Sequence, residues 1–371
     1  MTTTTPIPSR PSTTTWLAGV VALAILAGSI AGLVPTFGRP RAAVGTAATM
    51  GAERVSWVTG EASASRTDLG WNVHGTDLGH PVLHRGSLYL VFGDTWGRTG
   101  IEGSDWRSST MAKVASPDPR HGLMIESMVT TPDGEAAELL PSLKIDGVEK
   151  TVIPTHAISV GDRLVLHHMS VRRWLGAGRW EVSHAGFAVS DDVGATWSVS
   201  PESLLAGDGG FAQVAMVAQG DHVLIFGIPA GRHGPVRLAR SDPATLHLPA
   251  THEHWTGSGW DRSSGTGRVL VDGPVGELSV QWNQHLQRWL MMYLDPGRDA
   301  IVIRTAVAPT GPWSEPTVVT SATAHPQLYA PYIIPGTDTG SDLYFTMSQF
   351  GPYQVALMRT SLEALEGLGP T

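Results

Sequence analysis

A short apolar run recurs five times along this chain of 371 residues, and the repeat limits the folds that the chain can adopt. Each run follows a turn and another strand-like run, and each is followed by a third strand-like run. A repeat of this kind is typical of architectures in which each unit is one small sheet that buries its apolar faces against its neighbours. The five runs are residues 88–93, 164–169, 223–227, 289–294 and 343–347.

The flanking runs complete units of three antiparallel strands. No long helical periodicity interrupts the series, and only residues 362–368 near the C-terminus have a helical pattern. We therefore predict an all-β fold, a five-bladed β-propeller, with a β-sandwich of accidental internal similarity as the alternative. The preceding runs are residues 77–84, 155–160, 212–218, 277–282 and 329–334, and the following runs are residues 110–115, 185–190, 236–240, 301–307 and 354–359.

The composition excludes several classes of function. The net charge of -8 argues against a nucleic acid or an anionic membrane surface as the partner of the folded domain. The absence of cysteine excludes disulfides, thiol catalysis and cysteine-bound metals. Because no HExxH motif is present either, we predict no metal and no other cofactor.

The N-terminal segment predicts where the protein is located. Residues 1–15 form a polar region, and residues 16–34 are uncharged and mostly apolar over about the length of a membrane span. This stretch is either a transmembrane anchor or a cleaved signal peptide. We expect residues 35–64 to be a linker and residues 65–371 to be the propeller. The expected location is the cell envelope outside the cytoplasm, anchored or secreted, with the N-terminal helix as the only membrane contact.

One local motif supports a propeller without belonging to the site. Residues 190–197 (SDDVGATW) resemble the Asp-box hairpin of sialidases and other propellers. In that pattern, Ser and Asp side chains cap a turn and the Trp packs between strands. We therefore interpret Asp191 and Asp192 as structural residues.

The residues that open the innermost strand of each blade should converge at one mouth of the central channel. Two of these openings contain a carboxylate, Asp77 and Glu277. Pairing about the Arg85-Gly86 turn without a bulge sets Asp77 opposite Asp94, with Cβ atoms roughly 4.5–5.5 Å apart. Two carboxylates this close cannot both ionise easily, so the pKa of one rises. The alternative is a structural role, in which each aspartate caps a turn or binds backbone amides.

The predicted site therefore combines acids with polar and aromatic neighbours. Acids of this kind supply the proton donor and the carboxylate that glycoside hydrolysis requires. The separation of the two acids distinguishes a retaining enzyme from an inverting one, and the sequence leaves both open. The predicted catalytic residues are Asp77, Asp94 and Glu277, and the predicted substrate-binding residues are His74, Thr76, Trp96, His156, Gln213 and Tyr332.

Several motifs resemble the domain-of-unknown-function family 4185. They are residues 72–79 (NVHGTDLG), 92–97 (FGDTWG), 276–283 (GELSVQWN), 343–348 (LYFTMS) and 357–360 (LMRT). That family is similar to glycoside hydrolase family 183, which includes endo-D-arabinanases. The resemblance implies a five-bladed propeller that hydrolyses α-D-arabinofuranan in mycobacterial arabinogalactan and lipoarabinomannan. Asp77 and Asp94 match the acidic motif positions, and Glu277 matches the later Gly-Glu motif.

Three other functions remain open. A non-catalytic propeller that binds cell-wall glycan would need aromatic platforms but no opposed acids. A furanosidase for another sugar, such as L-arabinan or fructan, would have the same features. A sialidase is disfavoured, because only one Asp box is present and no inner-strand opening contains the arginine that binds the substrate carboxylate.

Overall fold

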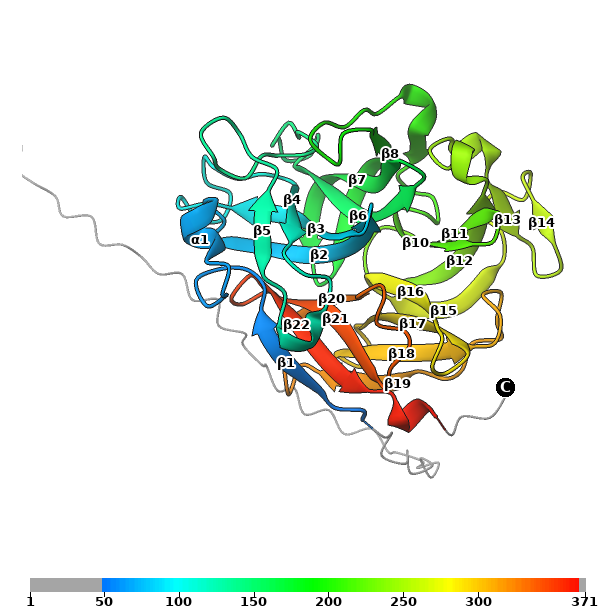
Figure 1. The fold of residues 1–371 in the computed structure, drawn as a ribbon. Coiled ribbons are helices and arrows are strands. Elements are labelled where there is room, and N and C mark those ends of the chain that lie inside the picture. Colours follow the sequence, from blue (N-terminus) through cyan, green and yellow to red (C-terminus); the bar gives the residue numbers. More distant parts are fainter. Residues whose placement is uncertain (1–48, 367–371) are drawn as a thin grey trace, which may run out of the picture. The chain divides into compact units, whose positions relative to one another are not determined.

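The computed structural model describes residues 49–366, and these form the predicted five-bladed β-propeller (Figure 1). The first three blades consist of strands that are consecutive in the sequence, and they end at Val275. The first consists of β2 (Gly75–His84), β3 (Ser87–Trp96), β4 (Thr110–Val114) and β5 (Ile125–Met128). The second consists of β6 (Thr151–Val160), β7 (Arg163–Gly176), β8 (Arg179–Ser190) and β9 (Leu204–Ala206). The third consists of β10 (Gln213–Gln219), β11 (His222–Ile228), β12 (Gly234–Ser241), β13 (Glu253–Trp255), β14 (Trp260–Asp261) and β15 (Val269–Val275), which pairs with β12.

The last two blades complete the ring. The fourth consists of β16 (Leu278–Asn283), β17 (Arg288–Asp295), β18 (Ala300–Ala306) and β19 (Thr317–Ser321). The fifth consists of β20 (Leu328–Ile333), β21 (Asp342–Gln349), β22 (Gln354–Ser361) and β1 (Ala52–Trp57). The inner strands contact one another in the cyclic order β2, β6, β10, β16, β20 and back to β2. Within residues 49–366, helical structure is short: α1 (Thr67–Gly70) and five 3₁₀ turns, of which Glu363–Leu365 lies in the predicted C-terminal helical segment.

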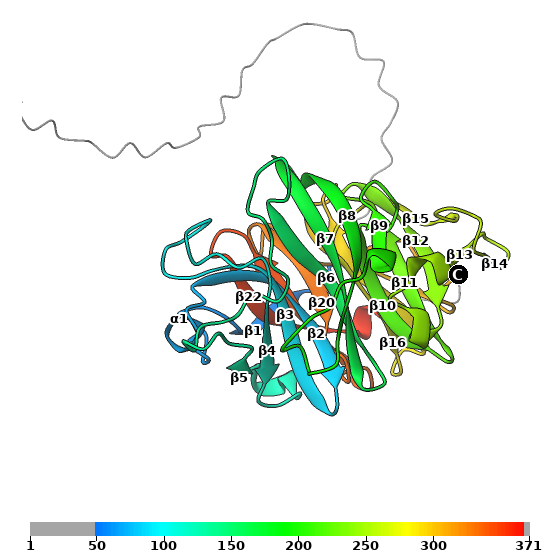
Figure 2. The same ribbon diagram turned by 90° about the horizontal axis from the view of Figure 1, so that it is seen from above.

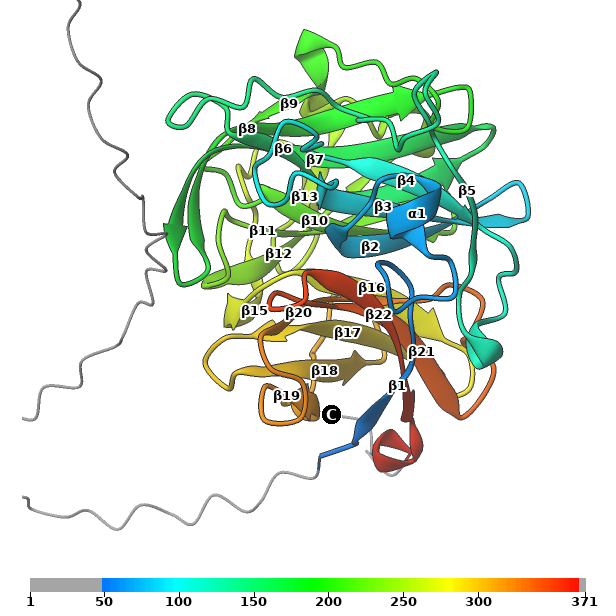
Figure 3. The same ribbon diagram turned by 90° about the vertical axis from the view of Figure 1, so that its left-hand side faces the viewer.

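The fifth blade differs from the sequence prediction, because its outer strand comes from the beginning of the domain. Strand β1 pairs antiparallel with β22, from Ala52 opposite Thr360 to Trp57 opposite Ala356. Figure 3 shows this blue strand beside the red β22. Residues 52–57, which we expected in a linker, are therefore part of the propeller. The linker prediction was wrong here because β1 is short and half exposed, and so has no continuous apolar run.

The repeated apolar run is explained by burial on both faces of the second strand in each blade. Along β3, Leu90 and Phe92 pack toward the fifth blade with Leu357, whereas Val91 packs toward the second blade with Leu166. The same alternation recurs along β17, where successive side chains pack toward the fifth and third blades. A strand buried on both faces needs apolar residues at every position, which produces an unbroken run rather than an alternating pattern.

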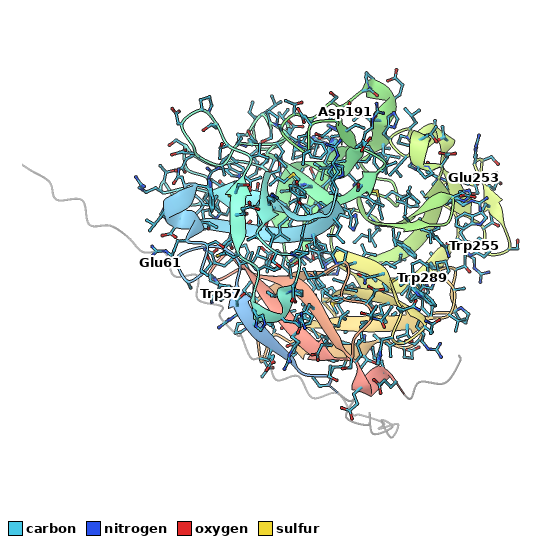
Figure 4. All side chains as sticks on the ribbon, viewed as in Figure 1. Trp57, Glu61, Asp191, Glu253, Trp255 and Trp289 are labelled. Atoms are coloured by element: carbon cyan, nitrogen blue, oxygen red, sulfur yellow. The ribbon has the colours of Figure 1, made fainter. Side chains whose placement is uncertain are left out.

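The Asp-box hairpin has the structural role that its sequence predicts. Asp192 accepts hydrogen bonds from Ser190 Oγ (2.8 Å) and from the Thr196 backbone N–H (2.8 Å). Trp197 Nε1 donates to the Gly194 carbonyl at 3.0 Å. Asp191 lies at the surface with a 71% exposed side chain (Figure 4).

The predicted anchor or signal segment, residues 16–34, lies outside the described residues. Within residues 49–366, no helix has both the length and the apolar composition that a membrane span requires.

Candidate active site

Bulges interrupt three of the inner strands close to one mouth of the channel. In β2 the register shifts between Thr76 and Leu78 and again between Leu78 and His80. Similar shifts occur between Pro154 and His156 in β6 and between Tyr329 and Tyr332 in β20. A bulge re-aims the side chains around it, so these positions determine which groups face the channel.

The predicted register holds at His80 opposite Val91 and again at Thr76 opposite Thr95, and it is interrupted only between these pairs. Thr76 pairs with Thr95 and Leu78 with Phe92, so Asp77 lies opposite Gly93 and Asp94 together rather than opposite Asp94 alone. The bulge requires left-handed backbone at Leu78 (φ 66°) and at Gly79 (φ 76°). A turn dipeptide fixes only the first pairs of a hairpin, so counting residues from the Arg85-Gly86 turn does not reveal a bulge farther along.

The bulged backbone is held by the fifth blade. Ser348 Oγ accepts a hydrogen bond from the Leu78 backbone N–H at 2.9 Å, and Thr346 Oγ1 donates to the Gly79 carbonyl at 2.9 Å. Both hydroxyls belong to β21. The polar groups that leave the β2–β3 ladder are therefore satisfied by a neighbouring blade, as buried backbone groups require.

A cavity of about 440 Å³ opens at this mouth. Six of the predicted site residues line it: Asp77, Asp94, Glu277, Trp96, Gln213 and Tyr332. The other three, His74, Thr76 and His156, do not.

Asp77 is held by two tyrosines. The hydroxyls of Tyr329 and Tyr353 donate to its Oδ2 at 2.9 and 3.0 Å, while its buried Oδ1 has no hydrogen-bond partner among the described residues. Burial and the nearby Asp94 raise the pKa of Asp77 to about 7, although the two tyrosine hydroxyls act in the opposite direction. The Asp77 carboxyl is therefore poised to hold a proton near neutral pH.

Asp94 lies in a different set of hydrogen bonds. Its Oδ1 accepts from Thr151 Oγ1 at 2.5 Å and from Trp106 Nε1 at 2.9 Å. Burial raises its pKa to about 6, and these two donors limit the rise. Both acids of the pair therefore keep their protons to a higher pH than a free aspartate does.

Glu277 is paired with a cation. Arg232 donates from Nε to Glu277 Oε1 at 2.9 Å, and its Nη2 lies 2.7 Å from the same oxygen. The guanidinium also lies over the ring of Tyr329, 4.9 Å from its centroid. An arginine side chain is always charged, so this ion pair offsets the charge of Glu277 in the cavity wall.

Three predicted binding residues also contribute to the wall. Trp96 packs its ring 4.6 Å from that of Tyr353, centroid to centroid. Gln213 Nε2 donates to the Gly231 carbonyl at 2.9 Å. Tyr332 stacks on His80 with ring centroids 3.6 Å apart and lines a second cavity as well.

The remaining predicted residues lie elsewhere. His74 is exposed, and its carbonyl accepts from Gln354 Nε2. Thr76 is fully buried and bonds to Thr95 Oγ1 at 2.7 Å. His156 lines the second cavity, of about 390 Å³, beyond the β6 bulge, and burial lowers its pKa to about 4. Among residues 49–366, no cluster of His, Cys, Asp and Glu side chains is suited to a metal ion.

The sequence analysis missed several lining residues. The long hairpin of β7 and β8 (Figure 2) reaches the cavity with its tip, including Gly178, whose carbonyl accepts from the Arg232 backbone N–H at 2.9 Å. Arg232 follows β11, and Tyr353 lies between β21 and β22, so neither opens an inner strand. No sequence pattern around Arg232 or Tyr353 indicated that they would reach the site. Tyr329, by contrast, lies in residues 329–334, the predicted inner strand of the fifth blade.

Comparison with known proteins gives a family and a fold. The profile of the domain of unknown function DUF4185 matches residues 62–359. Notoamide biosynthesis cluster protein J' of Aspergillus versicolor is 32% identical over 306 residues, which cover 76% of this chain and 82% of that protein. Protein J of Aspergillus sp. (strain MF297-2) is 31% identical over 308 residues, covering 76% and 80% of the two chains.

Two solved structures share the fold at low sequence identity. A Bacteroides ovatus protein, provisionally classed as a hydrolase, matches with a TM-score of 0.59 and 11% identity, over 82% of this chain and 90% of that one. The exo-β-1,3-galactanase of Phanerochaete chrysosporium matches with a TM-score of 0.52 and 10% identity, over 85% of this chain and 65% of that one.

The contact between Asp77 and Gly93 generates a prediction about the structure. A Cβ atom on residue 93 would overlap Asp77 Oδ1 and lie 2.9 Å from Leu78 Cδ1. We expect Gly93→Ala to displace the Asp77 carboxyl and break at least one tyrosine hydrogen bond. Overpacking of this kind costs about 1–3 kcal/mol, so the melting temperature should fall by several degrees. A crystal structure and a thermal melt measure both effects. Gly259→Ala, where the added atom meets open space, is the matched control; an unmoved Asp77 in the Gly93 variant would refute the prediction.

Proposed function

This chain belongs to the DUF4185 family, and we propose that it is a glycoside hydrolase. One observation carries the proposal: two carboxyl groups, Asp77 and Asp94, lie together in the wall of a cavity with pKa values raised to about 7 and about 6. Glycoside hydrolysis needs a proton for the leaving oxygen and a carboxylate that acts as a nucleophile or as a base toward water. Between pH 6 and 7 this pair supplies one of each.

The hydrogen bonds favour an assignment of roles. Asp77 has the higher pKa and holds the proton, which it donates to the departing oxygen as the glycosidic bond breaks. Asp94 is the carboxylate of the pair: as the glycosidic bond breaks, it either bonds to the anomeric carbon or takes a proton from the water that does, and in both cases water finally adds to that carbon. Thr151 and Trp106 hold one Asp94 oxygen in place, so the carboxylate is oriented before substrate binds.

Glu277 has a different place in this proposal from the one that its sequence position predicted. The ion pair with Arg232 engages both of its oxygens, at 2.9 and 3.2 Å from Arg232 Nε. We therefore propose that Glu277 orients Arg232 and shapes the field around Asp77, whose pKa its charge helps to raise. The pair that carries out the chemistry is Asp77 with Asp94.

The alternatives are weaker for physical reasons. A protein that only binds glycan gains nothing from two carboxyls whose pKa values are raised by burial, because the removal of ionisable groups from water is unfavourable. A sialidase requires a cluster of arginines that are available to the substrate carboxylate, whereas of the two arginines that line the cavity Arg232 is already paired with Glu277 and Arg179 alone remains. The galactanase with the same fold is named for the hydrolysis of a neutral glycan, which is compatible with a glycosidase here.

For the substrate, we propose the α-D-arabinofuranan of mycobacterial arabinogalactan and lipoarabinomannan, cut within the chain. The support is the resemblance of residues 72–79, 92–97 and 276–283 to a family similar to the endo-D-arabinanases of glycoside hydrolase family 183. Release of oligosaccharides from purified D-arabinan supports this version. Activity on L-arabinan alone would contradict it and leave the glycosidase proposal intact.

The two aspartates give the most direct test. Asp77→Asn and Asp94→Asn keep the shape of the side chain but remove the charge and the donatable proton. We expect each to lower turnover of D-arabinan by at least about a hundredfold, the lower end of general acid–base contributions. Reducing-sugar release measures this, with circular dichroism to confirm folding. Asp191→Asn, at an exposed position of the Asp box, is the matched control and should keep full activity. A folded Asp77 or Asp94 variant with normal turnover removes that residue from the mechanism.

The same pair predicts a bell-shaped dependence of activity on pH. Below about pH 6 both carboxyls are protonated and the anion is lost, and above about pH 7 both are ionised and the donor is lost. The Tyr353 hydroxyl lowers the pKa of Asp77, so Tyr353→Phe should move the alkaline limb to higher pH. Profiles of kcat/KM for the wild type, Tyr353→Phe and the control Tyr89→Phe measure the shift. An alkaline limb that moves to lower pH, or does not move, would contradict the assignment.

We also propose that the protein acts outside the cytoplasmic membrane, because residues 16–34 form an uncharged apolar stretch of membrane-spanning length. We expect cell fractionation to recover the protein with the envelope or the medium. N-terminal sequencing then separates the two forms: a start near Thr46 indicates a cleaved signal, and an intact N-terminus indicates an anchor. Full-length protein in the cytosol would contradict the location.

A further inference from the structure

Large apolar side chains surround the mouth of the acidic cavity without being buried. Ile101 is 67% exposed, Phe350 is 60% exposed and Trp174 is 39% exposed, and all three line the cavity. They come from three separate places: the β3–β4 loop, the turn after β21, and the end of β7. Exposed apolar side chains gathered around one opening indicate a binding surface more strongly than the same residues scattered singly. We refer to these three residues as the apolar rim.

The rim and the floor of the cavity differ in chemistry. On the floor, hydrogen-bonding groups are concentrated and largely engaged: the Tyr329 and Tyr353 hydroxyls bond to Asp77, and Gln213 bonds to a backbone carbonyl. Ile101 and Phe350 have no hydrogen-bonding side chain. The floor therefore holds its polar groups in fixed positions around Asp77, and the rim offers apolar surface.

Two of the rim residues are braced. Trp174 packs edge-on against Trp180 at 5.5 Å, and Phe350 packs edge-on against Tyr353 at 5.8 Å, between ring centroids. The tip of the β7–β8 hairpin is tied down by His233 Nε2, 3.0 Å from the Ala177 carbonyl. Side chains already held in place lose little conformational freedom when a ligand stacks on them.

We propose that the apolar rim is an outer subsite that binds the sugar units next to the one held at the acids, on a neutral glycan. The inference rests on the proposed glycoside hydrolase activity and identifies the surface that holds the rest of the chain. Sugar rings have C–H faces that stack on aromatic and aliphatic side chains. Because the rim stays in contact with water, the sugar hydroxyls keep their hydrogen bonds to solvent while only the C–H faces are covered.

The charges around the cavity favour a neutral ligand. The lining contains four carboxylates, Asp77, Asp94, Glu102 and Glu277, against two arginines, Arg179 and Arg232. Arg232 is paired with Glu277, and Glu102 lies 2.8 Å from Lys150. With those two pairs made and a proton on Asp77, the lining keeps one anion, Asp94, and one cation, Arg179, so it offers no cluster of positive charge to a polyanionic glycan, and the chain as a whole carries a net charge of -8.

The test separates binding at the rim from catalysis. Full-length protein carrying Asp94→Asn serves as the parent, so that glycan is bound without being cut. Trp174→Ala and Phe350→Ser are added singly, and Leu69→Ser, a 71% exposed residue outside the cavity lining, is the matched control. Isothermal titration measures affinity for D-arabinan oligosaccharides of increasing length, for xylan oligosaccharides, for polygalacturonate, and for octyl 1-thio-α-D-arabinofuranoside.

We expect the parent to bind a neutral oligosaccharide more tightly as the length of the oligosaccharide increases. Each rim variant should bind the longer oligosaccharides roughly tenfold or more weakly than the parent does. A single sugar unit, methyl α-D-arabinofuranoside, should bind the parent and the rim variants equally. The control should match the parent throughout.

Equal affinity of rim variants and parent for the longer oligosaccharides would overturn the inference. The inference would also be overturned if the parent bound polygalacturonate or the octyl glycoside more tightly than it binds the neutral oligosaccharides. Such a result would assign the rim to an anionic or a fully apolar group. Because these are binding measurements, hydrolysis by the wild type decides the proposed function separately. Bound but uncut glycan would overturn the glycosidase proposal, and cut glycan with no rim effect would overturn only the subsite.

Discussion

The site depends on one bulge, at Asp77 to Gly79 of the first inner strand. The bulge turns Asp77 out of the ladder toward Tyr329 and Tyr353 and places Gly93 against its Oδ1. A left-handed non-glycine residue such as Leu78 costs about 1–3 kcal/mol, and the surroundings must hold it. Here Ser348 and Thr346 of the fifth blade satisfy the freed backbone groups. The acid of the first blade is therefore positioned by the last one, and strand β1, which completes that last blade, contributes indirectly to the site.

The acids are placed at the expense of stability. The pKa values of both are raised in the folded state, so the fold binds these protons more tightly than the unfolded chain does. The tighter binding of these protons stabilises the fold fully below about pH 4, and this contribution is lost as the pH rises through about 6 and then about 7. At neutral pH the buried acids therefore no longer stabilise the fold. Selection for stability alone would not bury two acids in this way, which is why their placement indicates chemistry.

The fold was predictable because the second strand of each blade is buried on both faces, and burial of that kind leaves a continuous apolar run in the sequence. The positions of Asp77, Asp94 and Glu277 followed from where those strands begin and end. Their mutual geometry did not follow, because a bulge leaves no signature in residue types when Leu78 takes the left-handed conformation that glycine usually takes. Arg232 and Tyr353 lie in connections between outer and middle strands, whose path around the mouth depends on the assembled ring.

Arg232 connects parts of the site that are far apart in the sequence. Its guanidinium neutralises Glu277 and lies over Tyr329, whose hydroxyl holds Asp77, while its backbone N–H binds the tip of the hairpin that carries Trp174. Without this cation, a third uncompensated carboxylate would raise the pKa of Asp77 further and move the proton donor away from neutral pH. The same residue thus sets the charge balance at the floor and fixes one side of the rim. A cavity with an acidic floor and an apolar mouth needs such a link, because Ile101 and Phe350 of the rim lie in connections between strands, whereas Asp77 lies in an inner strand.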